Sequence, residues 1–445
     1  NFFSLLKNGN LPSSLSKLNL SDTNFSSEDI ISIFESQVIS RHIDLKSRDL
    51  KNEGKCFYTI GSSGHEGNAV FGRVFQIQDM AFLHYRSAPF FIERSKKING
   101  SSPIYDLALS FMASSDDPIS GGRHKVIGSK KLNLPPQTST IASHLPKAVG
   151  TAFSIDHAKG LDISEKCLED ESIVICSFGD ASANHSTALS AFNTASLISN
   201  QGGHVPIVFI CEDNGLGISV PTQGNWIEEN FKNRYGIEYI KSDGLNLLDL
   251  FNKTLFAEQT CRTKRHPVFL HMKTVRLMGH AGSDVELGYQ SLKDLKDSEN
   301  NDPLLHSSRI LIENNCLTSE EILALYELSR NQVNHVFNNA TFRPTLKSSD
   351  EVMSSISLNV DKKNLPENVD PKIRENKLGK EFKRLKIPQH MAKLINYGLF
   401  DILMRFSNTI VFGQDVAKKG GVYHVTADLL KNFGPRRIFD SPLDE

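Results

Sequence analysis

Two short segments carry side chains suited to binding a metal ion. They are residues 178–181 (FGDA) and 211–215 (CEDNG), and each lies at the end of an apolar run. In an open parallel sheet, ligands bind beyond the carboxyl ends of the strands, so two strand ends can share one ligand. The carboxylate of Asp180, the amide oxygen of Asn214 and a nearby backbone carbonyl are hard oxygen donors, which suit Mg²⁺ that also binds phosphate. The pattern predicts a magnesium diphosphate site, although each segment alone is also typical of an ordinary turn.

The elements that must position these side chains are predicted to form an α/β domain. Apolar segments alternate with glycine-containing turns over residues 60–288, and the clearest strands are 172–178, 205–211 and 267–272. Each is a largely apolar run of the kind that is buried on both faces in a parallel sheet. Residues 185–199 have the apolar spacing of a crossover helix between the first two strands.

The composition varies along the chain and predicts four parts. Residues 1–59 are a poorly ordered lead-in followed by a helix over 27–45, and residues 60–340 form the main domain. Residues 341–390 are charged and interrupted by prolines, which is typical of a linker. Residues 391–445 are predicted to open a second domain.

The second domain is expected to be only partly present. Its predicted elements are a helix over 391–406, a strand over 409–413 and a short helix over 426–433. These elements are too few to bury a core alone. We therefore expect the chain to stop early in this domain, and the absence of an initial Met suggests that its beginning is also cut.

Charge and cysteine content exclude several classes of protein. Fifty basic and fifty-one acidic residues leave a net charge of -1, so no overall basic excess attracts nucleic acid or an anionic membrane. The longest apolar stretches are far shorter than the roughly 20 residues of a membrane helix. Six cysteines without a CxxC pair argue against a zinc knuckle or a disulfide framework. We expect a protein of the reducing cytoplasm.

The spacing from Gly-Asp to Asn resembles the thiamine diphosphate motif, and the resemblance extends to other segments. Residues 82–87, 138–150 and 274–280 are similar to the α-type half of the decarboxylating dehydrogenase component of 2-oxo acid dehydrogenase complexes. Residues 411–423 and 439–445 resemble the start of the β-type half of that component. The resemblance implies a three-layer thiamine diphosphate-binding fold with a parallel sheet, fused to the incomplete start of a second α/β domain.

The resemblance also implies roles for individual residues around the cofactor. It assigns Mg²⁺ to Asp180, Asn214 and the backbone carbonyl of Leu216. It assigns the diphosphate to Tyr85 and Arg86. An arginine suits this task because its planar guanidinium donates two parallel hydrogen bonds and keeps its charge.

Further cofactor contacts are implied for Ser139, for the backbone of Ile141 and for the motif residues Gly179 and Ala181. Ala181 departs from the glycine that the family usually has. Ala is the least intrusive replacement, provided that the backbone there does not need a positive φ. The motif is also longer than usual, with residues 199–203 as the surplus, and a surface loop can absorb such an insertion.

Three residues are implied to act near the substrate. His280 matches the active-site histidine of the family, and its imidazole could stabilise charge on an intermediate or assist acyl transfer to a lipoyl group. Glu445 matches the β-half glutamate that hydrogen-bonds the aminopyrimidine ring. It ends the chain, so we expect the chain alone to lack a complete active site. His124 is a weaker candidate for the substrate pocket, and a solvent-exposed loop is the alternative.

The function implied by the resemblance is oxidative decarboxylation of a 2-oxo acid by thiamine diphosphate, with acyl transfer to lipoamide on a partner acyltransferase. A branched-chain acid such as 3-methyl-2-oxobutanoate is favoured over pyruvate. Because the sites of the family form where α-type and β-type halves meet, the complete protein is expected to form a homo-oligomer. The alternatives are a transketolase-like carboligase and a fragment that binds the cofactor without turnover.

Two other patterns are set aside. His65-Glu66 is not followed by the second histidine of a zinc protease helix. The sequence that begins at Gly215 lacks the third glycine of a dinucleotide fingerprint. Neither pattern predicts a ligand.

Overall fold

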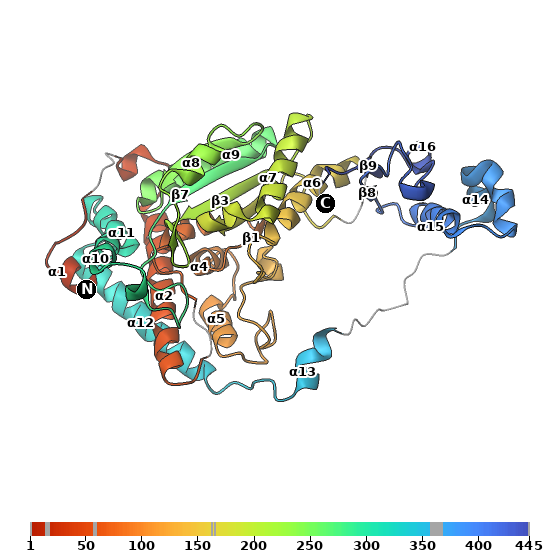
Figure 1. Ribbon diagram of the computed structural model, residues 1–445. Coiled ribbons are helices and arrows are strands. Elements are labelled where there is room, and N and C mark those ends of the chain that lie inside the picture. Colours follow the sequence, from red (N-terminus) through yellow and green to blue (C-terminus); the bar gives the residue numbers. More distant parts are fainter. Residues whose placement is uncertain are drawn as a thin grey trace. The chain divides into compact units, whose positions relative to one another are not determined.

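The computed structural model describes residues 2–13, 18–56, 60–161, 163, 166–356 and 368–443. The chain forms two compact units (Figure 1). The first comprises Asn1–Ala152 and Glu171–Ser354, and the second comprises Phe153–Asp170 and Ser355–Glu445.

A five-stranded parallel sheet forms the centre of the first unit. Its strands, in spatial order, are β1 (Met80–Phe82), β2 (Val174–Gly179), β3 (Ile207–Asp213), β7 (Val268–Lys273) and β6 (Glu238–Asp243). Every residue of β2 and β3 is buried, as expected for strands that are covered on both faces. The α/β fold with a parallel sheet, predicted from the apolar runs, is confirmed.

Two helices pack on one face of this sheet through aromatic side chains. They are α7 (Ser186–Asn200) and α8 (Trp226–Phe231). Phe192 of α7 and Phe231 of α8 lie 4.9 Å apart between ring centroids, and Phe231 stacks on Phe269 of β7 at 4.1 Å. The helix predicted over 185–199 corresponds to α7.

Helices α3 (Ala69–Val74), α4 (Ala88–Ser95) and α9 (Leu247–Lys264) cover the opposite face. Their apolar side chains share one core cluster with alternate strand residues such as Val208 and Leu270. Successive side chains of a strand point to opposite faces, so the strands contribute to both helix layers. The unit therefore has the three layers that the resemblance implies.

The N-terminal residues differ from the expected lead-in. Helix α1 (Phe2–Lys7) buries Phe2 and Leu6 in the core of the first unit. Helix α2 (Ser27–Asn52) is longer than predicted, begins with a capping box at Ser26 and is buried along most of its length. Residues 1–59 are thus part of the first unit and not a separate segment, because their apolar residues complete its core.

Further helices are α5 (Pro103–Phe111), α6 (His144–Gly160), α10 (Leu292–Asn300), α11 (Pro303–Glu313), α12 (Ser319–Ala340) and α13 (Ser349–Met353). An antiparallel hairpin of β4 (Leu216–Gly217) and β5 (Val220–Pro221) follows β3. No helix among the described residues combines the length and apolar character needed to cross a membrane.

The second unit contains a parallel pair of strands and several helices. The strands are β8 (Val411–Gly413) and β9 (Ile438–Asp440), and the helices are α14 (Pro371–Leu378), α15 (Met391–Arg405) and α16 (Leu429–Phe433). Strand β9 is only three residues long, too short for its apolar pattern to predict it. The small core consists of Leu378, Tyr397, Phe400, Leu403, Leu429 and Ile438.

The expected linker over 341–390 differs from the structure. Helix α13 belongs to the first unit, and α14 belongs to the second. Leu378 is buried, and Phe382 and Leu385 pack against the same core, because these sparse apolar residues share one side of a charged segment. Residues 357–367 lie outside the described residues.

Candidate active site

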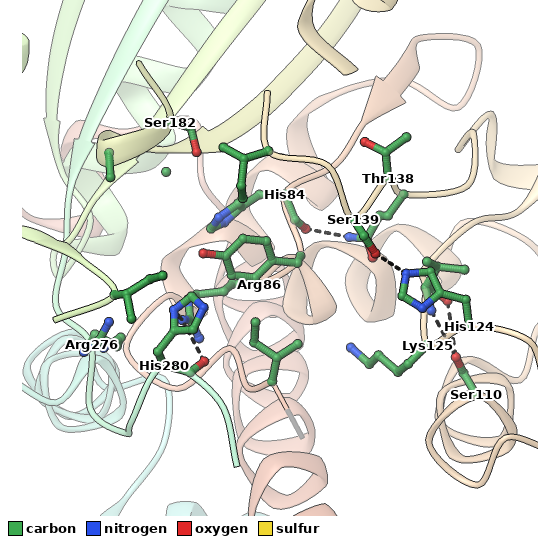
Figure 2. A pocket seen from close by; sticks show the side chains of 18 of the residues that line it. His84, Arg86, Ser110, His124, Lys125, Thr138, Ser139, Ser182, Arg276 and His280 are labelled. Carbon is green, nitrogen blue, oxygen red and sulfur yellow. Dashed lines mark hydrogen bonds between the residues drawn. The ribbon is translucent and has the colours of Figure 1, made fainter. Parts of the chain in front are cut away.

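A cavity of about 690 Å³ lies in the first unit and brings the predicted site residues together (Figure 2). Its lining includes every predicted site residue within the described part of the chain: Tyr85, Arg86, His124, Ser139, Ile141, Gly179, Asp180, Ala181, Asn214, Leu216 and His280. Glu445 lies outside the described residues. The cavity therefore joins segments that are almost 200 residues apart in the chain.

The register of the sheet explains why the two motif segments meet. Strands β2 and β3 are parallel neighbours, and Gly179 pairs with Glu212. Asp180 follows the last residue of β2, and Asn214 follows the last residue of β3. Both side chains therefore leave the sheet at the same edge, as expected from the strand pattern.

Asp180 is buried, and this burial is unfavourable for its negative charge. The hydroxyl of Thr222 donates a hydrogen bond to one carboxylate oxygen. Burial raises the pKa of Asp180 to about 6, and the nearby Asp213 carboxylate also raises this pKa. A bound divalent cation would offset the cost of this buried charge, so Asp180 fits the implied magnesium ion.

Both polar atoms of the Asn214 side-chain amide form hydrogen bonds. Its Oδ1 accepts a hydrogen bond from the backbone N–H of Leu216 at 3.0 Å, and its Nδ2 donates to Nε2 of His65 at 2.8 Å. A carboxylate and an amide oxygen at one cavity are the hard oxygen donors that Mg²⁺ prefers. The residues present therefore fit the metal.

Ala181 occupies its motif position without backbone strain. It lies in the 3-10 helix Asp180–Asn184 and is not among the residues with a positive φ. The condition under which alanine can replace glycine there is therefore met. The Ala181 side chain faces Gly217, where an added Cβ would lie 2.9 Å from the Ala181 Cβ.

Arg86 connects the β1 end of the cavity to the loop of His280. One terminal nitrogen of its buried guanidinium donates to the Gly61 carbonyl at 2.5 Å, and the other donates to the His280 carbonyl at 3.1 Å. The guanidinium also lies over the Tyr85 ring, 5.1 Å from its centroid. These contacts hold a permanent positive charge at the wall of the cavity.

His280 lies in the loop after β7 and is uncharged at neutral pH. Burial, together with the guanidinium groups of Arg86 and Arg276, lowers its pKa to about 4. Its backbone N–H donates to the Asp284 carboxylate at 2.6 Å, which fixes the loop. Nδ1 of the ring accepts a hydrogen bond from the Arg86 guanidinium at 3.3 Å, so the proton of the neutral ring is on Nε2, which can donate at the cavity.

The remaining predicted residues lie at the exposed rim. The His124 ring hydrogen-bonds the Ser139 hydroxyl, and both residues are exposed. Ile141 is 43% exposed. His124 therefore belongs to an exposed loop and also lines the cavity, so the two alternatives considered for it are compatible.

Several residues at or beside the cavity were not predicted. They are His65, His84, Lys125, Glu212 and Arg276. The available signal was adjacency: Glu212 stands two residues before Asn214, and His84 directly precedes Tyr85. His65 was rejected as a zinc ligand, and its hydrogen bond to Asn214 depends on a contact between residues 149 positions apart.

The amino-acid sequence is similar to those of several known proteins. The 2-oxoisovalerate dehydrogenase subunit alpha, mitochondrial, of Caenorhabditis elegans is 27% identical over 282 residues, which cover 62% of this chain and 60% of the worm protein. The protein of the same name from Mus musculus is 26% identical over 325 residues, or 72% of this chain and 69% of the mouse protein. The 2-oxoisovalerate dehydrogenase subunit alpha of Bacillus subtilis is 24% identical over 299 residues, or 66% of this chain and 84% of the bacterial protein.

The family comparison covers the chain from within α2 to the start of α13. The family described as "Dehydrogenase E1 component" matches residues 35–349, well over half of the chain. The matched range contains the whole cavity and both motif segments. The chain therefore belongs to the dehydrogenase E1 component family.

Proposed function

We propose that this chain binds thiamine diphosphate and Mg²⁺ and serves in the oxidative decarboxylation of a branched-chain 2-oxo acid. The acyl group would pass to lipoamide on a partner acyltransferase. The observation that carries the proposal is that Asp180 and Asn214 leave paired strand ends and line one cavity. The family supports the cofactor, and the names of the relatives support a branched-chain substrate such as 3-methyl-2-oxobutanoate.

The charges in the cavity suit a metal-bound diphosphate and an acidic substrate. A cation would stabilise the buried Asp180 carboxylate, whereas Arg86, Lys125 and Arg276 supply positive charge to the same cavity. Opposite charges in a partly buried site interact more strongly than in water. A divalent ion with a polyphosphate and a carboxylic acid would satisfy both sets of side chains.

In this proposal, Mg²⁺ binds Asp180, Asn214 and the carbonyl of Leu216, and the diphosphate binds Tyr85 and Arg86. When bound, thiamine diphosphate supplies the carbon nucleophile for the 2-oxo group and accepts the electron pair that remains after carbon dioxide leaves. Gly179 and Ala181 shape the backbone around the ion, and Ser139 and Ile141 contact the cofactor at the rim. All of these residues line the cavity.

His280 and His124 would act on the substrate side. Neutral His280 can donate a hydrogen bond from Nε2 to charge that develops on the substrate, because Nδ1 accepts from the Arg86 guanidinium and the charged form of the ring is disfavoured. His124 is placed at the exposed rim, where an entering acid would meet it. Glu445 is proposed to contact the aminopyrimidine ring.

We also propose that the second unit opens a β-type half and that the complete protein forms a homo-oligomer. The parallel pair of β8 and β9, with α16 between them in sequence, is the start of an α/β arrangement. In the described part of the chain no disulfide joins any of the six cysteines, which supports a reducing compartment such as the cytoplasm.

The metal assignment is tested by thermal unfolding with and without Mg²⁺ and thiamine diphosphate. At about 100 times the dissociation constant, bound ligand stabilises the folded protein by about 2.7 kcal/mol. Asp180→Ala should abolish this stabilisation, while Asp297→Ala, at an exposed site on α10, should retain it. An unchanged response in Asp180→Ala would refute the metal role.

The reaction is tested with a panel of 2-oxo acids and free lipoamide. Carbon dioxide release coupled to lipoamide acylation is expected, with branched-chain acids preferred over pyruvate. Carbon–carbon bond formation with an aldehyde acceptor, without lipoamide acylation, would instead identify a transketolase-like carboligase. Cofactor binding without any turnover would identify a binding fragment.

A further inference from the structure

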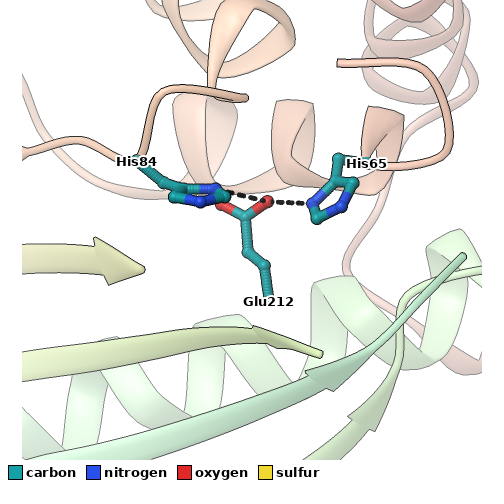
Figure 3. A group of neighbouring side chains, drawn as sticks. All are labelled: His65, His84 and Glu212. Atoms are coloured by element: carbon teal, nitrogen blue, oxygen red, sulfur yellow. Dashed lines mark hydrogen bonds and ion pairs between the residues drawn. The ribbon is translucent and has the colours of Figure 1, made fainter. Parts of the chain in front are cut away.

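A buried group of His65, His84 and Glu212 lies beside the proposed metal site (Figure 3). Glu212 rises from β3 between the two imidazole rings, and His65 and Glu212 are fully buried. Their ligand atoms lie within 4.8 Å of one another. The group could therefore be a second metal site or a hydrogen-bonding network, and the hydrogen bonds distinguish the two.

The orientation of the Asn214 amide determines the direction of these hydrogen bonds. The backbone N–H of Leu216 can only donate, so the Asn214 atom that receives it at 3.0 Å is the oxygen. The other amide atom is then the nitrogen, which lies 2.8 Å from Nε2 of His65. Because an amide NH₂ donates, Nε2 must be the nitrogen without a proton.

The proton of the neutral imidazole must then be on Nδ1. This atom lies 2.7 Å from Oε2 of Glu212, which also accepts from the amide of Asn68 at 3.3 Å. All four contacts are satisfied by one arrangement, in which Asn214 donates to His65 and His65 donates to Glu212. A metal ion between His65 and Glu212 would have to displace the proton on Nδ1, so the hydrogen bonds favour a network over a second metal site.

We infer that Glu212 and His65 are positioning residues that hold the Asn214 amide with its oxygen toward the proposed magnesium ion and its nitrogen away from it. The inference rests on the magnesium site of the proposed function. An amide that turned over would present an NH₂ group, which cannot ligate a cation. Substitutions that remove the hydrogen-bond partners of a metal ligand commonly lower the affinity for the metal by about 10–100-fold.

A constrained backbone turn before His65 fixes the position of this residue. Gly64 has a φ of +101°, and a Cβ at this residue would lie 2.2 Å from the carbonyl oxygen of Val275. Only glycine allows this close approach. The His65 N–H also donates to the Ser62 carbonyl at 2.7 Å, so the imidazole enters the core from a fixed turn.

The test measures Mn²⁺ binding by electron paramagnetic resonance in the presence of thiamine diphosphate. His65→Leu removes the acceptor for the Asn214 amide and should raise the dissociation constant of Mn²⁺ by about 10–100-fold. His65→Gln keeps one acceptor and one donor and should recover most of the affinity. His42→Leu is the matched control, because His42 is buried in α2 and contacts Tyr326 away from the cavity.

A double-mutant cycle distinguishes an effect on the orientation of the Asn214 amide from a general disruption of the site by His65→Leu. Asn214→Asp replaces the amide by two equivalent oxygens, so His65→Leu should change Mn²⁺ affinity less than threefold in that background. An equal loss in both backgrounds would overturn the inference. If wild-type protein binds neither Mn²⁺ nor thiamine diphosphate, the proposed function fails, whereas tight wild-type binding that His65→Leu leaves unchanged overturns only this inference.

A measurement on the wild-type protein tests the tautomer of His65 directly and needs a variant only to assign the signals. The ¹⁵N shifts of the His65 ring, assigned by their loss in His65→Gln, should show a protonated Nδ1 and a bare Nε2. The opposite tautomer would overturn the inference. Stoichiometric zinc that is lost in His65→Leu would also overturn it, because it would identify the group as a metal site.

Discussion

Replacing Lys125 by Met should stabilise the ligand-free protein at neutral pH. The Lys125 amine points into the cavity (Figure 2), 4.7 Å from the centroid of the Phe111 ring. Among the described residues, no carboxylate lies within ion-pair distance of it. Burial lowers the pKa of Lys125 to about 8, and the Arg86 guanidinium contributes to this decrease, while Asp44 and Cys56 oppose it.

The expected gain follows from this pKa. A decrease from 10.5 to about 8 corresponds to roughly 3 kcal/mol of penalty on the charged form, at about 1.4 kcal/mol per pH unit. The attraction of the ammonium to the Phe111 ring, about 1 kcal/mol, offsets part of the gain from removing the charge. We therefore expect Lys125→Met to raise the free energy of unfolding by about 2 kcal/mol at pH 7.

The pH dependence gives the sharper test. Because the folded pKa lies below the unfolded value, the wild type carries the full penalty below about pH 8 and regains stability as the pH rises to 10.5. The advantage of Lys125→Met should therefore be largest at pH 7 and small at pH 10. Urea unfolding at both pH values measures it, with the exposed Lys131→Met as the control. Lower stability of Lys125→Met at pH 7, or an equal difference at both pH values, would refute the reasoning.

Further substitutions test the packing and chemistry of the same unit. Gly217→Ala should lower the free energy of unfolding by about 1–3 kcal/mol because its Cβ would clash with the Ala181 side chain. Ala181→Gly should relieve this destabilisation. An equal destabilisation by Gly217→Ala with Ala181 and with Gly at position 181 would exclude the clash. Arg41→Met should cost about 3–5 kcal/mol in urea unfolding because it leaves two buried carboxylates unpaired, and a loss under 1 kcal/mol would contradict this. His280→Ala should slow acyl transfer to lipoamide by about 10²–10⁴-fold while thermal stabilisation by thiamine diphosphate persists; loss of both would make the residue structural.

Local apolar runs predicted β2, β3 and β7 of the five-stranded sheet but not β1 or β6, and most cavity residues other than Asp180 and Asn214 were assigned by the resemblance. Residues 207–211 of β3 are all apolar because the strand is covered on both faces, and this is visible without a structure. Asp180 and Asn214 could be placed at one edge because parallel neighbouring strands end together. The same patterns misplaced the segment around Leu378, where a few apolar residues among many charges are enough for a small core.

The sequence by itself determined which side chains stand at the strand ends, because apolar periodicity and strand direction are local properties. Only the tertiary structure decided that His65 contacts Asn214 and that Lys125 lies in the cavity with no carboxylate of the described residues at ion-pair distance. A buried polar side chain acquires its role from the atoms that replace water around it. Those atoms come from distant parts of the chain, as when Glu212 meets His65 across 147 positions, so no local pattern records them.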